Sequence, residues 1–276
     1  MSEFPPITLY SYAMSPYAAK LHGMLLYKQV PFTVRYINPL RAKKELPIGH
    51  QVPALTIGDE ARNDSTPCGL WLDETFPDQP RLLPDDPALR EKLMAIDTWV
   101  SDSLIPASFR TYPGEGVNRW INGWKLSHVM GATAHSGLPW ILKWLWPTVV
   151  TRVPFVRHMF AMAEADGLSI EDAKFKLYDE FIAHLDGGPF LAGQDKPHLP
   201  DFSCYPQFAL FWMLGFRGAD DILQRPELMA WLERMRPYVD LDPAITPHHV
   251  RVNDMPMSDG AFDSLTRPLF RSQMSR

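Results

Sequence analysis

The stretch "ITLYSYAMSPYAAKL", residues 7–21, decides the start of the fold, because its pattern changes from extended to helical within a few residues. Its first part, "ITLYSY", is rich in β-branched and aromatic residues and predicts a strand. Ser15 and Pro16 then make a good helix start, since serine is a favoured N-cap and proline suits the first helical position. Apolar residues at helical spacing follow and predict a helix over 16–29.

Patterns of the same kind continue as far as residue 77 and predict a small mixed module. "FTVRYI", 32–37, alternates apolar and polar residues as a half-buried strand does, and "STPCGLWLDETF", 65–76, predicts a closing helix. Between them lie a short charged helix in "PLRAKKEL" (39–46), a strand in "VPALTIG" (52–58) and, after a Gly-Asp turn, an edge strand in "EARN" (60–63). The predicted order is βαβαββα, in which the first helix is the crossover that a parallel βαβ unit needs.

The proline-rich stretch "FPDQPRLLPDDP", 76–87, has the composition of a domain linker. Strand signals largely vanish beyond it, and helices are predicted over 88–104, 169–188, 199–216 and 225–239, of which the third is apolar enough to be central and buried. We therefore predict an α+β two-domain protein: a first domain over 1–78, a linker at 79–87, an all-α domain over 88–240 with an atypical insertion near 113–165, and an extension over 241–276.

The composition narrows the classes of function. The 276 residues are 46% hydrophobic and 21% charged, which is enough apolar material for a real core. A net charge of −5 gives no general attraction to nucleic acid or to anionic membranes, so we expect no nucleic-acid partner. Two cysteines, Cys68 and Cys204, exclude a disulfide framework, and no histidine motif indicates a metal. With no secretory signal in view, we expect a cytoplasmic protein.

The most apolar segment is "GLPWILKWLWPTVV", 137–150. It is too short to span a bilayer and contains Lys143 and two prolines, so we expect no stable membrane insertion. We interpret it as a buried or interface segment. A helix lying on a membrane surface is the alternative.

The order of these elements and several short motifs resemble the glutathione transferase superfamily. The motifs are "SP" at 15–16 with Lys20 further along the helix, "QVPAL" (51–55), "DS" (64–65), "LWLDETFP" (70–77) and "FLAGQDKPHLPDFSCYP" (190–206). The resemblance covers roughly residues 6–110 and 168–238. It implies a thioredoxin-like first domain, an all-helical second domain, glutathione as co-substrate and a homodimer.

The chain departs from the family pattern at several points. Leu46-Pro47 stands where the family often has Asn-Pro, His198 precedes Asp201 where a threonine or serine is usual, and aspartate replaces glutamate at position 64. Ser15 occupies the position of the nucleophilic cysteine of thiol-exchanging relatives. The stretch Ser15–Ala18 contains no sulfur, so disulfide exchange by a C-x-x-C motif is excluded there. We interpret Cys68 as a buried, inert thiol.

Ser15 has two interpretations. From the residues alone it is an N-cap, yet a helix that begins after a parallel strand also begins where α/β modules bind ligands. A helix N-terminus carries about half a positive charge and unpaired N–H groups, which favour an anion. The resemblance implies that Ser15 donates to the sulfur of glutathione and stabilises its thiolate. Tyr12 and Tyr10 are rivals for that catalytic role.

The resemblance also implies a binding site for the rest of glutathione. A cis bond between Val52 and Pro53 would turn the Val52 backbone toward the peptide, although an ordinary trans proline also fits a strand start. Asp64 and Ser65 would hold the γ-glutamyl end, with the acid facing the ammonium and the hydroxyl facing the carboxylate. As helix caps the same two residues need no ligand. The residues expected near the glycyl end are His50, Gln51 and, more weakly, Lys43.

Six of the nine tryptophans fall between residues 99 and 146. In the family, early helices of the second domain line the pocket opposite glutathione, which suggests as wall residues Trp99, Phe109, Arg110, Tyr112 and Trp120. Such a pocket suits a hydrophobic electrophile. The expected function is that of a glutathione transferase. The alternatives are a non-catalytic binding or scaffold protein on the same fold, or a glutathione-dependent isomerase, ether-cleaving enzyme or peroxidase.

Overall fold

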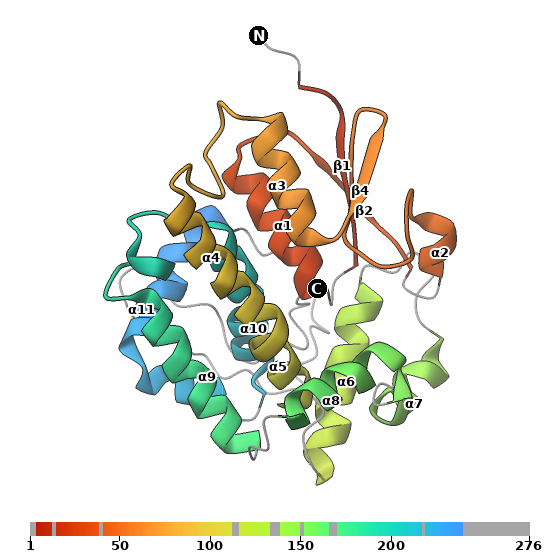
Figure 1. The fold of residues 1–276 in the computed structure, drawn as a ribbon. Helices are drawn as coiled ribbons and strands as arrows, with labels where there is room; N and C mark the ends of the chain where they lie inside the picture. The colour runs from red at the N-terminus through yellow and green to blue at the C-terminus, as the bar shows by residue number, and fades with distance from the viewer. Residues whose placement is uncertain are drawn as a thin grey trace, which may run out of the picture.

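The computed structural model describes residues 4–12, 15–38, 41–111, 116–132, 139–149, 152–165, 170–216 and 219–239. It has a small sheet domain above a larger group of helices (Figure 1). The sheet domain consists of β1 (Ile7–Ser11), α1 (Pro16–Tyr27), β2 (Thr33–Tyr36), α2 (Ala42–Glu45), β3 (Ala54–Ile57), β4 (Glu60–Asn63) and α3 (Ser65–Thr75). This is the predicted βαβαββα order.

The four strands form one mixed sheet in the order β2-β1-β3-β4. Strand β1 runs parallel to β2, with Leu9 opposite Val34, and antiparallel to β3, with Leu9 opposite Leu55. The crossover between the parallel strands is α1, as predicted. Leu9 and Leu55 are fully buried beneath α1, which packs beside α3 and contributes the buried Met24 to the same core. The N-termini of α1 and α3 are thereby held on one rigid frame.

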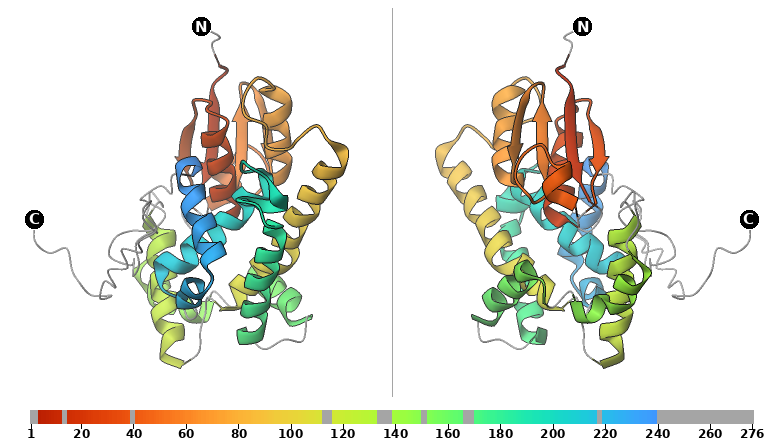
Figure 2. Two further views of the ribbon diagram at one scale, coloured as in Figure 1. Left: turned by 90° about the vertical axis from the view of Figure 1, so that its left-hand side faces the viewer. Right: turned by 90° about the vertical axis from the view of Figure 1, so that its right-hand side faces the viewer.

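The remainder of the described chain is helical, as predicted. Its helices are α4 (Pro87–Trp99), α5 (Ile105–Thr111), α6 (Gly116–Ala132), α7 (Trp140–Val149), α8 (Pro154–Ala165), α9 (Ile170–Leu185), α10 (Leu199–Leu214) and α11 (Pro226–Met235). A π-helical turn over Val100–Leu104 joins α4 to α5, so the helix predicted over 88–104 continues in altered form to Thr111. In both side views the sheet stands above these helices (Figure 2).

The central helix of the protein is α10, and all of its residues are buried, as its apolar sequence predicts. Asp201 accepts from the backbone N–H of His198 at 2.9 Å, while Gly215 ends the helix in a left-handed conformation. Helix α10 packs against α1 of the sheet domain. Gly23 permits this contact, because a Cβ atom there would lie only 3.1 Å from the ring of Phe202 and 2.8 Å from Val239.

The proline-rich segment between the two parts is attached to the sheet domain by Asp73. The buried Asp73 carboxylate accepts from the backbone N–H of Leu82 at 2.9 Å and of Leu83 at 3.0 Å. It also pairs with the buried Lys28 ammonium at 3.0 Å. The Leu82 carbonyl in turn accepts from the N–H of Leu199 at the start of α10, at 2.9 Å. The segment is thus fixed from both sides at its middle.

Helix α7 lies within the most apolar segment of the sequence, and only one of its sides is buried. Pro147 packs on α6 so closely that a Cβ atom at Gly123 would lie 2.5 Å from it, and Trp146 is also buried. Trp140 and Trp144 on the other side are exposed. Of the two interpretations of this segment, burial therefore holds for one side only, and an interface on the exposed side stays a prediction. Within the described residues, no helix combines the length and the apolar character that crossing a membrane requires.

Candidate functional site

Ser15 is the N-cap of α1 and still has a hydroxyl proton to donate. The residue is extended, 5% exposed, and its Oγ accepts from the backbone N–H of Ala18 at 3.2 Å. Among the described residues, no acceptor takes the proton of this hydroxyl. The structure therefore confirms Ser15 as a helix cap and leaves its hydroxyl proton available to a bound group, so the second interpretation stays a prediction.

Tyr12 lies beside the start of α1 and the turn before β3. It packs with Tyr10 against a small apolar cluster formed by Ala18, Ile37 and Val52. The Tyr12 carbonyl accepts from the backbone N–H of Ser15 at 3.2 Å. Burial raises the pKa of the Tyr12 phenol, so the group is neutral and acts as a hydrogen-bond donor.

Asp64 precedes α3 in a strained backbone conformation. Its φ is 72° and its ψ 134°, a region that non-glycine residues rarely adopt and that costs about 1–3 kcal/mol. Its backbone N–H donates to the Pro53 carbonyl at 3.2 Å and its carbonyl accepts from Cys68, which ties α3 to the turn before β3. The carboxylate is exposed and makes no capping hydrogen bond, so it is available to bind a cation.

Ser65 is the first residue of α3 and is only 1% exposed. Its hydroxyl makes no hydrogen bond within the part of the chain that the structure describes. This hydroxyl stands at a helix N-terminus, where the peptide dipoles favour an anion. Asp64 and Ser65 together therefore present an acidic group and an anion-binding group side by side.

Tyr17 belongs to the same region, and the sequence analysis missed it. Burial and, to a smaller extent, the carboxylates of Asp64, Asp102 and Asp97 together raise its pKa to about 12. The phenol is therefore a neutral group that can donate a hydrogen bond. Its place two residues after Ser15, in the first turn of the same helix, is the sequence signal that indicates it.

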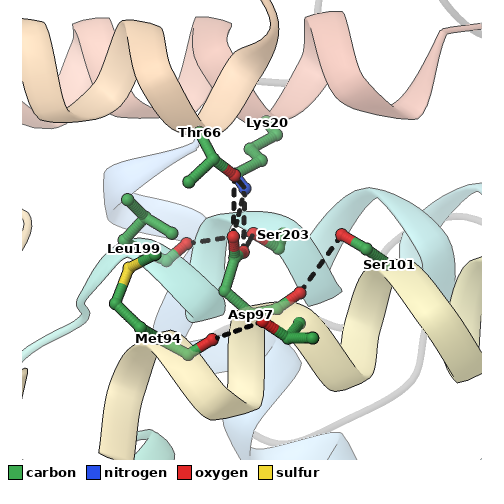
Figure 3. Close-up of polar contacts among 8 residues, drawn as sticks. Lys20, Thr66, Met94, Asp97, Ser101, Leu199 and Ser203 are labelled. Atoms are coloured by element: carbon green, nitrogen blue, oxygen red, sulfur yellow. Dashed lines mark hydrogen bonds and ion pairs between the residues drawn. The ribbon is translucent and has the colours of Figure 1, made fainter. Parts of the chain in front are cut away.

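A buried polar cluster fixes the start of α3 (Figure 3). The ammonium of Lys20 on α1 lies 2.8 Å from Asp97 Oδ1 on α4 and 2.7 Å from Thr66 Oγ1 on α3. Thr66 donates to Asp97 Oδ2 at 2.7 Å, and Ser203 on α10 donates to Asp97 Oδ1. Four helices from both parts of the protein thus hold Thr66, the residue that follows Ser65. The sequence analysis had noted only Lys20 in this cluster.

The turn before β3 carries the other residues predicted to bind glutathione. The Val52–Pro53 peptide bond is cis, and both residues are buried. The side chains of His50 and Gln51 are exposed beside this turn, and Lys43 is exposed on α2. Over the described ranges, no group of three or more histidine, cysteine or acidic residues could hold a metal ion.

Cys68 lies in the first turns of α3 but is fully buried. Burial raises the pKa of its thiol to about 12, with a smaller contribution from Asp64. The thiolate is the reactive form of cysteine, so a thiol with this pKa is inert near neutral pH. This agrees with its interpretation as a structural residue.

The predicted wall of the second pocket is not assembled from the side chains that the structure describes. Trp99 donates to Glu180 on α9 at 2.8 Å and packs on the His184 ring at 4.6 Å, so it faces α9. Phe109 is half-buried against the main core, and Trp120 is half-exposed on α6. Tyr112 and the side chain of Arg110 lie outside the described residues. The position of Trp99 does not favour a role beside Ser15.

Comparison with known proteins identifies the sheet domain and the overall fold. Residues 9–80 match the family model for the glutathione S-transferase N-terminal domain. The whole structure is similar to the beta-etherase LigF from Sphingobium sp. strain SYK-6, with a TM-score of 0.57, 20% identity, and coverage of 87% of this chain and 96% of that one. None of the curated proteins matches the chain.

Two plant enzymes are similar at the level of the fold. Rice GST1, solved in complex with glutathione, has a TM-score of 0.54 and 16% identity, over 89% of this chain and 92% of that one. Glutathione transferase F2 from Populus trichocarpa has a TM-score of 0.55 and 15% identity, over 84% and 93%. The similarity extends over nearly the whole length of these proteins.

Proposed function

We propose that this protein binds glutathione and activates its thiol for attack on a hydrophobic electrophile. The match of residues 9–80 to the glutathione S-transferase N-terminal domain and the similarity of the fold to that of a glutathione-bound transferase support this proposal. The observation that carries this proposal is the pair of uncommitted hydroxyl groups at two neighbouring helix starts. Ser15 on α1 has a proton to donate, and the Ser65 hydroxyl on α3 makes no hydrogen bond among the described residues. Glutathione has a group for each of them.

The γ-glutamyl end of glutathione is a zwitterion and fits the start of α3. Its carboxylate would accept from the Ser65 hydroxyl and from the free N–H groups of the helix. Its ammonium would lie against the exposed Asp64 carboxylate, and Tyr17 is a neutral donor next to both. The strained backbone of Asp64 supports this role, since such strain is retained where function requires a particular geometry.

The thiol end fits the start of α1. Lowering a thiol pKa by two units requires about 3 kcal/mol of preference for the thiolate. One hydrogen bond to an anion contributes about 1.5–3 kcal/mol, so the Ser15 hydroxyl and the helix N-terminus together supply the amount required. Tyr12 is the second candidate donor, because its phenol is neutral and its backbone is hydrogen-bonded to that of Ser15. The resulting thiolate would attack the electrophile.

The peptide part of glutathione would lie along the turn before β3. The backbone of Val52 would pair with it in an extended arrangement, as a strand pairs with a neighbour. His50 and Gln51 are exposed beside this turn and are available to the glycyl carboxylate. This placement joins the two helix starts and the turn into one continuous site.

Titration calorimetry tests the proposal with matched serine variants. We expect glutathione to bind the wild-type protein, and Ser65→Ala to weaken binding by tenfold or more, because a charge-assisted hydrogen bond is lost. The melting temperature should change little, since the Ser65 hydroxyl has no partner among the described residues. Ser127→Ala is the control: this buried serine donates to Trp124 on its own helix, at 2.7 Å, and its removal should leave affinity unchanged.

Two results would contradict the proposal. One is the absence of any heat or melting shift with millimolar glutathione. The other is a Ser65→Ala protein that binds glutathione as tightly as the wild type. Binding without turnover across a panel of electrophiles would support the non-catalytic alternative on the same fold.

A further inference from the structure

Helix α7 presents an apolar side to solvent. Trp140 and Trp144 are 73% and 67% exposed, and Ile141 and Leu145 beside them are exposed as well. Trp140 and Trp144 are four residues apart, as are Ile141 and Leu145, and Ile141 and Trp144 are three apart, so the four share one side of the helix. A helix on the surface of a soluble protein normally carries charged or polar residues there. The other side is packed on α6, so α7 carries apolar residues on its buried and on its exposed side.

Helix α6 adjoins α7 and adds to the exposed apolar surface. Val117 is 75% exposed and Trp120 is 51% exposed. The two helices are packed firmly together, since Arg119 Nε donates to the Pro147 carbonyl at 3.1 Å. We call this surface the α6–α7 face; its residues are Val117, Trp120, Trp140, Ile141, Trp144 and Leu145.

The segment of the chain that contains the α6–α7 face differs in the sign of its charge from the rest of the chain. Residues 116–163 include no aspartate or glutamate and five basic residues: Arg119, Lys125, Lys143, Arg152 and Arg157. Of these, Lys125 is buried and donates to the Leu214 carbonyl, so it adds no charge to the surface. The whole chain has 27 basic and 32 acidic residues, so the remainder has 22 and 32 and a formal charge of −10. Arg152 and Arg157, which follow α7 in the chain, are exposed. Figure 1 shows α6, α7 and α8 gathered at the lower right of the helical part.

We propose that the α6–α7 face binds the surface of a membrane that contains anionic lipids. Tryptophan is suited to the boundary between headgroups and acyl chains, where its ring is apolar and its N–H finds a partner. An amphipathic surface with exposed tryptophan, isoleucine and leucine, flanked by basic residues, is the pattern of interfacial binding. The absence of acidic residues over 116–163 removes the repulsion that the rest of this acidic chain would experience.

Charge also argues against a second copy of the chain as the occupant. A two-fold dimer through the α6–α7 face would place the same surface on both sides of the contact. The basic segment over 116–163 would then face itself with no acidic residue to compensate it. An anionic bilayer supplies the opposite charge and an apolar layer together.

Vesicle co-sedimentation of the full chain tests this proposal. We expect the protein to sediment with phosphatidylcholine–phosphatidylserine vesicles, more weakly with phosphatidylcholine alone, and less as salt is raised. Trp140→Gln/Trp144→Gln should reduce binding by tenfold or more and abolish a blue shift of tryptophan fluorescence. Leu223→Gln removes an exposed apolar residue outside this segment and should leave binding unchanged.

A charge-reversal variant measures the electrostatic contribution to vesicle binding separately from the apolar contribution. Arg152→Glu/Arg157→Glu should weaken binding to the anionic vesicles severalfold and flatten its salt dependence, whereas Lys196→Glu, an exposed charge elsewhere, should do neither. Near-ultraviolet circular dichroism and glutathione affinity verify that every variant is folded.

Three outcomes would overturn the proposal. The wild-type protein could fail to sediment with anionic vesicles, or the double tryptophan variant could bind them as the wild type does. Sedimentation velocity could instead reveal a dimer that Trp140→Gln/Trp144→Gln dissociates, without vesicle binding, which would assign the face to self-association. Capture of a defined soluble partner by this face, again without vesicle binding, would count equally against a membrane.

Discussion

Lys20 and Asp97 form a buried ion pair that joins α1 of the sheet domain to α4 of the helical part, with Nζ 2.8 Å from Oδ1. Both side chains are 5% exposed. Thr66 and Ser203 complete the hydrogen bonding of the carboxylate, so the pair is satisfied as a buried pair must be. Its position next to Ser65 links the packing of the two parts to the proposed glutathione site.

Lys20→Met should lower the free energy of unfolding by about 3–5 kcal/mol, because Asp97 is left buried without its partner. Urea unfolding measures the loss. Lys92→Met removes an ion pair with Asp186 that is exposed, and should cost much less. The double variant Lys20→Met/Asp97→Leu should recover most of the stability. A Lys20→Met protein as stable as the Lys92→Met protein would contradict this account of the cluster.

Ser15→Ala should lower glutathione-dependent turnover by tenfold or more, while stability falls by only about 1 kcal/mol from the lost cap. Asp86→Ala provides a matched cap loss, since Asp86 caps α4 by accepting from Leu89 at 2.9 Å. We expect Asp86→Ala to reduce stability by a similar amount and to leave turnover unchanged. Steady-state kinetics and thermal melts distinguish the two. Equal turnover in both variants would return Ser15 to a structural role alone.

Asp64→Gly should stabilise the fold by about 1 kcal/mol, because glycine adopts a φ of 72° without strain. The same change removes the carboxylate proposed to meet the ammonium of glutathione, so affinity should fall. Gln29→Gly relieves a similar φ of 55° at the end of α1 and should add stability without changing affinity. Denaturant unfolding of both variants measures the change in stability, and calorimetry measures the change in their affinity for glutathione. Unchanged affinity in Asp64→Gly would remove Asp64 from the site.

Lys125 should make stability depend on pH above neutrality. It is buried, its Nζ donates to the Leu214 carbonyl at the end of α10, and burial lowers its pKa to about 8. An unfolded chain has a lysine pKa of about 10.4, so between these values the unfolded state binds more protons than the folded state.

The free energy of unfolding, compared with that of Lys125→Met, should therefore rise with pH across this window. The slope should not exceed about 1.4 kcal/mol per pH unit. Below the pKa of Lys125 in the folded state, the difference in the free energy of unfolding between the two proteins should be constant. Urea unfolding of both proteins at a series of pH values measures it. A difference that stays flat through the window would show that Lys125 keeps an ordinary pKa.

The sequence predicts the sheet domain well because its signals are local. Alternation in "FTVRYI", the Ser15-Pro16 helix start and the Gly-Asp turn each act within a few residues, and their order leaves one arrangement of strands. The burial of α10 follows equally well from composition, since a helix that is apolar all round belongs in a core.

The same rule fails for α7, which is also strongly apolar and yet is exposed on one side. The composition of an apolar helix does not indicate whether it packs in the core or lies on the surface. The Lys20–Asp97 pair was not predictable for a different reason, because 77 residues separate its members and only the crossing of α1 with α4 brings them together. Trp99 faces α9 because it lies two positions after Asp97, on a different side of the same helix.

The anchoring of Leu82 and Leu83 by Asp73 has a mechanical consequence. A proline-rich connector usually lets two domains swing, but here the connector is bonded to α3 on one side and to α10 on the other. The two halves should move as one body and melt in a single calorimetric transition. Any adjustment to an incoming substrate then falls to side chains and single helices, because this joint does not act as a hinge.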